Sequence, residues 1–105
     1  MDNDWLAGPN LNKLKREKRL VVAINGEEVL LLWLNQDVLA IENTCPHQGF
    51  PLERGSLNVD SRVLSCPFHG WRFDLLTGKC LHAQVSVPTY QVKLDGIQIW
   101  LRKQT

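Results

Sequence analysis

Residues 19–42 read RLVVAINGEEVLLLWLNQDVLAIE, and this stretch indicates the fold. Runs rich in apolar and β-branched residues predict three strands, at Arg19–Ile24, Glu28–Leu34 and Val38–Glu42. Asn25–Gly26 separates the first two runs, and this dipeptide favours a type I′ hairpin because both of its positions need positive φ. The polar residues Asn35–Asp37 supply the next turn. The stretch therefore predicts consecutive antiparallel strands.

The C-terminal part of the chain has a similar pattern. Apolar residues alternate with polar ones in two runs, at Tyr90, Val92 and Leu94 and at Ile97, Ile99 and Leu101. Asp95–Gly96 joins the runs as a second tight turn. Residues 1–18 are weakly patterned, with one helical turn expected around Leu11 and Leu14. We expect an all-β fold, a small antiparallel sandwich or barrel, that occupies residues 1–105 as a single domain.

Composition excludes several classes of protein. The chain has 105 residues, 44% hydrophobic and 22% charged, with a net charge of +1, so no global charge favours nucleic acid or an anionic membrane. Basic residues do cluster near the N-terminus, where we expect a solvated surface and, as the alternative, a docking patch for an acidic partner: Lys13, Lys15, Arg16, Lys18 and Arg19.

The location of the protein can also be predicted. The longest apolar run, Val29–Leu34, is far shorter than the ~20 residues that a membrane-spanning helix needs. The N-terminal sequence MDNDWLAGPN carries two acidic residues and no apolar stretch, unlike a secretory signal. The three cysteines are an odd number, which argues against a closed set of disulfides. We expect a cytoplasmic, reduced protein without a membrane contact.

Two short segments contain candidate metal ligands. The first reads Cys45-Pro46-His47-Gln48-Gly49, and the second reads Cys66-Pro67-Phe68-His69-Gly70-Trp71. Each supplies one thiolate and one imidazole, and the prolines and glycines indicate loops at about residues 44–53 and 65–72. A zinc site is the main alternative, although structural zinc sites usually pair cysteine with cysteine and histidine with histidine. A catalytic cysteine is less favoured, because the sequence offers no third orienting group.

The pattern C-x-H followed by C-x-x-H resembles the Rieske family over roughly residues 20–102. The resemblance implies a Rieske fold, with a two-loop cluster-binding subdomain and one [2Fe–2S] cluster per chain. It implies that Cys45 and Cys66 bind one, buried iron and that His47 and His69 bind the outer iron, which accepts the electron. Two thiolates and two neutral imidazoles leave the oxidised cluster with zero net charge, so its potential lies above that of an all-cysteine ferredoxin.

Departures from the family pattern indicate the low-potential branch. High-potential members carry a disulfide across the cluster, and the matching positions here are Phe50 and Phe68. They also place serine and tyrosine hydroxyls against the sulfurs, where this chain has Trp71 and Phe73. A proline-rich third loop is common in the family, and this chain offers only Pro88, so that loop is not assigned. We expect a potential of roughly −150 mV.

The third cysteine and the third histidine lie outside the two motifs. Cys80 follows the Thr77-Gly78 turn and is expected to be a buried thiol. His82 is expected to be an ordinary surface or partly buried residue.

The resemblance implies an electron carrier that is not itself an enzyme. We expect a monomeric ferredoxin that takes electrons from a flavin reductase and passes them to a ring-hydroxylating oxygenase. The alternatives are a small subunit of an assimilatory nitrite reductase and a Rieske domain with a sensing or structural role. An oxygenase in its own right is disfavoured, because a non-haem iron site needs two further histidines and only His82 remains.

Overall fold

The computed structural model describes residues 5–46, 49–68 and 70–104, and within these ranges strands dominate. The elements run in the order β1 (Leu6–Asn10), α1 (Leu11–Glu17), β2 (Arg19–Ile24), β3 (Glu27–Leu34), β4 (Asp37–Glu42), β5 (Ser56–Asn58), β6 (Val63–Ser65), β7 (Arg72–Asp74), β8 (Tyr90–Asp95) and β9 (Gln98–Lys103). Every strand pair is antiparallel. The predicted all-β fold is confirmed.

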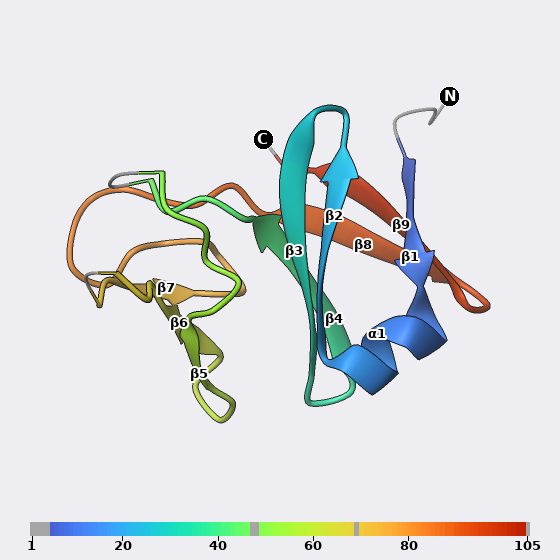
Figure 1. The fold of residues 1–105 in the computed structure, drawn as a ribbon, viewed down its shortest axis with the longest axis horizontal. Helices are drawn as coiled ribbons and strands as arrows, with labels where there is room; N and C mark the ends of the chain where they lie inside the picture. The colour runs from blue at the N-terminus through green and yellow to red at the C-terminus, as the bar shows by residue number, and fades with distance from the viewer. Residues whose placement is uncertain (1–4, 47–48, 69, 105) are drawn as a thin grey trace.

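The described strands form three sheets of three strands each, in the orders β2-β3-β4, β1-β9-β8 and β5-β6-β7. The first two sheets lie against each other in Figure 1, whereas β5-β6-β7 stands to one side with the long loops. One hydrophobic cluster lies between the first two sheets and the helix, and it includes Leu14, Leu31, Ile99 and Leu101. The chain is thus a sandwich that carries a smaller subdomain.

Three tight hairpins fix the register of the two large sheets. Ile24 pairs with Glu27, so Asn25 and Gly26 form the turn, with φ of 51° and 80° as a type I′ turn requires. Between β3 and β4 the two turn residues also have positive φ. The third hairpin differs from the prediction, because Asp95 pairs with Gln98 and the turn is Gly96–Ile97. Ile97 is therefore 52% exposed instead of lying in a strand.

Strand β3 is buried on both of its faces. Leu30, Leu32 and Leu34 pack in a second hydrophobic cluster, beside the subdomain, whereas Val29 and Leu31 face the interior of the sandwich. Successive side chains of a strand point in opposite directions, so only a continuous apolar run can be buried in this way. The sequence VLLLWL meets this requirement.

The N-terminal segment contains a strand that the sequence did not predict. Strand β1 has the sequence LAGPN and pairs only with the edge of β9, through a register shift between Ala7 and Asn10. Glycine, proline and a bulge hide the period-2 pattern on which strand prediction depends. The expected helical turn is confirmed as α1, whose Leu11 and Leu14 are buried and whose N-cap is Asn10.

The subdomain strands β5, β6 and β7 were also not predicted. Each has only three residues, too few to show a periodic pattern. Among the described residues, no helix is long and apolar enough to cross a membrane.

Candidate metal centre

The second candidate loop is the connection of a hairpin. Ser65 at the end of β6 pairs with Arg72 at the start of β7, and residues 66–71 lie between them. The Cys66 N–H donates to the Trp71 carbonyl at 2.7 Å, and the Gly70 N–H donates to the Cys66 carbonyl at 3.0 Å. These two bonds fold the loop tightly around the Cys66 carbonyl.

The first candidate loop has the same hydrogen bonds without a hairpin. The Cys45 N–H donates to the Phe50 carbonyl at 2.7 Å, and the Gly49 N–H donates to the Cys45 carbonyl at 2.7 Å. Gly49 and Gly70 both have positive φ, of 78° and 74°, which a residue with a side chain adopts only with strain. The two loops are therefore structural equivalents, as expected of a site with two similar halves.

The loops bring the two candidate thiols into one buried cluster. Cys45 is 0% exposed and Cys66 is 2% exposed, and both pack in the hydrophobic cluster that contains Leu52, Leu64 and Phe73. Neither forms a disulfide. The remaining predicted ligands, His47 and His69, lie outside the described residues. Within the described ranges, no group of three or more His, Cys, Asp or Glu side chains could hold a metal.

The donor set fits a [2Fe–2S] cluster. Thiolate sulfur is the ligand that iron–sulfur clusters require, and here it comes from two equivalent loops within a largely apolar cluster.

Aromatic residues occupy the positions that differ from high-potential members of the resembled family. The rings of Phe50 and Phe68 stack with centroids 4.2 Å apart and planes inclined by 26°. Trp71 is half-buried, and Phe73 is fully buried in the same cluster as the two thiols. None of these four side chains carries a hydroxyl group.

The predictions for Cys80 and His82 are confirmed. Cys80 is a free thiol, 9% exposed, and its Sγ accepts a hydrogen bond from the His82 N–H at 3.4 Å. His82 is exposed, and its Nε2 accepts from Nε of Arg72 at 3.2 Å. Both residues lie beside β7, the strand that follows the second loop.

Two polar residues that support the first loop were missed by the sequence prediction. Asn43 is only 2% exposed, and Arg19 donates through Nη1 to the carbonyls of Glu53 and Gly55, at 2.7 and 2.8 Å. Arg19 was expected in the solvated basic surface, but it is half-buried and connects β2 to the segment after the first loop. Asn43 lies in a short polar run, Glu42–Thr44, before a candidate ligand, and nothing in the sequence distinguishes it from its two neighbours.

A group of titratable residues lies at the end of the sandwich where the first loop begins. Lys103 Nζ lies 3.0 Å from Oε2 of Glu27 and 3.8 Å from Oε1 of Glu42. The hydrogen bond with Lys103 lowers the pKa of Glu27, whereas burial raises the pKa of Glu42. Burial, together with the charge of Glu27, raises the pKa of Tyr90 to about 12.

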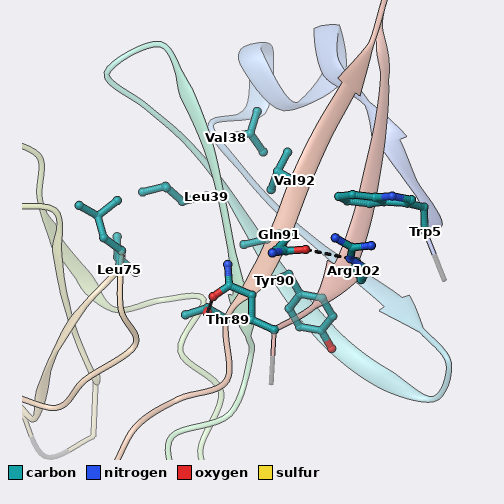
Figure 2. Close-up of a pocket in the computed structure, with 12 residues that line it drawn as sticks. Trp5, Val38, Leu39, Leu75, Thr89, Tyr90, Gln91, Val92 and Arg102 are labelled. Atoms are coloured by element: carbon teal, nitrogen blue, oxygen red, sulfur yellow. Dashed lines mark hydrogen bonds between the residues drawn. The ribbon is translucent and has the colours of Figure 1, made fainter. Parts of the chain in front are cut away.

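A separate groove of about 530 Å³ lies between the edges of β4 and β8. Figure 2 shows Trp5 over the Arg102 guanidinium, which also donates to Gln91 at 2.8 Å. The Arg102 Cζ lies 4.3 Å and the Lys93 Nζ lies 4.7 Å from the centre of a Trp5 ring. No residue of either candidate ligand loop lines this groove.

The model of the Rieske [2Fe-2S] domain matches residues 4–93. The chain belongs to this family. It is 28% identical, over 99% of its length and all of the relative's, to the ferredoxin component of naphthalene 1,2-dioxygenase/salicylate 5-hydroxylase systems of a Ralstonia species. The solved ferredoxin of carbazole 1,9a-dioxygenase from Nocardioides aromaticivorans IC177 is 29% identical and superposes with a TM-score of 0.86 over 97% of this chain and all of that one.

A further solved chain shares the fold of this Rieske domain. It comes from a complex of reduced oxygenase and oxidized ferredoxin in carbazole 1,9a-dioxygenase, with 23% identity, a TM-score of 0.83 and 99% of both chains covered. The predicted family and its [2Fe–2S] cofactor are therefore confirmed, and the fold is that of Rieske ferredoxins.

Proposed function

We propose that this Rieske protein is a one-electron carrier, a single domain over residues 1–105, with one [2Fe–2S] cluster per chain. Cys45 and Cys66 hold one iron, and His47 and His69 hold the other. The observation that carries the proposal is the pair of loops with equivalent backbone hydrogen bonds, each of which buries one cysteine side chain in the same hydrophobic cluster. When bound, the cluster takes up and releases one electron at a potential set by its ligands and surroundings.

The protein residues around the site exclude water and fix the ligands. Leu52, Leu64 and Phe73 are fully buried beside the two thiols, so solvent does not reach the cysteine side of the site. The positive-φ glycines keep both loops folded back on the cysteine carbonyls. Electron transfer needs little structural reorganisation when the ligands of the redox site stay in place in both oxidation states. This property suits an electron carrier better than an enzyme with a substrate cavity.

The partners of the carrier are a flavin reductase as donor and a ring-hydroxylating terminal oxygenase as acceptor. Two observations support this choice. The relatives that match along their whole length are ferredoxin components of dioxygenase systems, and a chain of the same fold occurs in a complex with its oxygenase. The carrier is monomeric and cytoplasmic, and it performs no substrate chemistry of its own.

The test begins with the metal content of the purified protein. We expect two irons and two acid-labile sulfides per chain, with a Rieske electron paramagnetic resonance spectrum after reduction. Cys45→Ser and Cys66→Ser should remove the iron, whereas the control Cys80→Ser should retain it. Stoichiometric zinc without iron would contradict the proposal.

Electron transfer is then measured directly. The protein, reduced by a flavin-dependent ferredoxin reductase, should be reoxidised by an aromatic-ring dioxygenase within a stopped-flow experiment, and it should elute from a sizing column as a free 12.0 kDa monomer. Permanent association with a larger enzyme would favour a subunit instead of a carrier.

A further inference from the structure

The two ligand loops differ in what closes their ends. The second loop is closed by the ladder of β6 and β7, in which Ser65 pairs with Arg72 and Leu64 pairs with Phe73. The first loop has no such ladder, because β4 ends at Glu42 and β5 begins only at Ser56. Its flanking residue Pro51 also lacks the N–H that a strand pair would use.

The side chain of Asn43 supplies the missing closure. The same offset along the chain that relates Cys45 to Cys66 relates Asn43 to Leu64 and Leu52 to Phe73. Where Leu64 and Phe73 pair as strand residues, the Asn43 Oδ1 accepts from the Leu52 N–H at 3.0 Å. One buried amide therefore joins the two ends of the first loop, as a strand pair joins those of the second.

The same amide connects the loop to the sandwich. The Asn43 N–H donates to the Glu28 carbonyl at 2.8 Å, which places residue 43 next to β3. Its Nδ2 donates to Oε1 of Glu53 at 3.1 Å and to Oε1 of Glu28 at 3.3 Å. All the polar atoms of this buried side chain are thus engaged, with a backbone donor on one side and two carboxylates on the other.

We propose that Asn43 is a positioning residue for the iron–sulfur cluster, one that holds Cys45 in place by closing the first ligand loop against β3. This inference rests on the proposed function, because it assumes that Cys45 is a ligand. Asn43 is not itself a candidate ligand, and it acts through the backbone that presents the thiol.

The test uses the isosteric variant Asn43→Asp in the intact holoprotein. Aspartate keeps an acceptor for the Leu52 N–H but removes both donors and places a third carboxylate beside Glu28 and Glu53. We expect iron loss to a chelator to become ~10-fold faster, the size typical for removal of an outer partner of a metal site. The resonance lines of the reduced cluster should shift, and the Leu52 amide should exchange faster.

Two further variants make the result specific. The double variant Asn43→Asp with Glu53→Gln restores a donor and acceptor pair, in which the carboxylate is now at residue 43 and the amide at residue 53. It should recover most of the iron retention and the wild-type spectrum. Asn58→Asp is the matched control, because the Asn58 Oδ1 accepts from the Ser61 N–H at 3.1 Å in a turn of the subdomain outside both ligand loops. It should leave the spectrum and the iron retention unchanged.

The outcomes separate the inference from the proposed function. A wild-type Rieske spectrum, with Asn43→Asp indistinguishable from Asn58→Asp in spectrum and iron loss, would overturn the role of Asn43 alone. A lower thermal stability with an unchanged spectrum and iron loss would also overturn it, because Asn43 would then be merely structural. A wild-type protein without the Rieske spectrum would overturn the proposed function and this role with it.

Discussion

The rings of Phe50 and Phe68 stack across the two candidate ligand loops, with their centroids 4.2 Å apart. The resemblance to the family implies that high-potential members have cysteines at these positions, which form a disulfide. Here a noncovalent contact replaces that covalent bond, so the loops are held together without a second redox-active group. Phe68 nevertheless remains 60% exposed, so one ring of the stack faces solvent.

The stack should make the two loops energetically dependent on each other. Stacked aromatic pairs contribute about 0.5–1.5 kcal/mol beyond the area they bury, so Phe50→Ala and Phe68→Ala should be non-additive by that amount. The measurement is a double-mutant cycle on the rate of iron loss. Ile97→Ala, at an exposed residue of the β8–β9 turn, is the control and should add independently. Strict additivity of the two phenylalanine variants would show that the ring contact carries no coupling.

A hydroxyl group next to the cluster should raise its potential. Phe73 is fully buried beside both thiols, and Phe73→Tyr would place a donor there. A hydrogen bond that favours the reduced cluster by about 1.4 kcal/mol raises a one-electron potential by about 60 mV, from a starting value of roughly −150 mV. Protein-film voltammetry measures the change.

Phe68→Tyr provides the control for that measurement, since it adds the same hydroxyl to an exposed ring. It should change the potential by much less than the ~60 mV expected at Phe73. A wild-type potential well above zero would place the chain in the high-potential branch instead.

The single tyrosine of the chain should titrate unusually late. Tyr90 is buried and donates to Oε1 of Glu27 at 3.3 Å, and its pKa is raised to about 12. In the unfolded chain the phenol should titrate near ~10. The folded state therefore keeps its proton at a pH where the unfolded state has lost it, so stability is full below pH ~10 and falls as the pH rises toward 12.

Absorbance at 295 nm follows this titration without interference from another tyrosine. Glu27→Gln should lower the midpoint, because it removes the negative charge that faces the phenol, while burial keeps the midpoint above the unfolded value. A folded-state midpoint equal to that in denaturant would contradict the prediction.

The sequence predicted those parts of the fold that a short stretch of residues determines by itself. Asn25–Gly26 marked its turn because few other residues tolerate two positive φ angles, and the candidate ligands were found because their spacing is specific. Strand β1 was missed because its pairing with β9 is decided by tertiary contact and not by its own sequence. Asn43 and Arg19 were missed for a related reason, since their partners lie far away in the chain or in loops whose course no periodicity reveals.

The burial of β3 on both of its faces has a consequence for how the protein unfolds. Because it contributes one face to the sandwich interior and the other to the cluster that contains the thiols, neither interior can open without exposing leucines of the other. The protein should therefore behave as one cooperative folding unit, in which the amides of β3 exchange only through global unfolding. A destabilising substitution in the part of the sandwich far from the thiols would then reduce the amount of folded, electron-carrying protein. It would not leave a locally unfolded sandwich beside an intact redox centre.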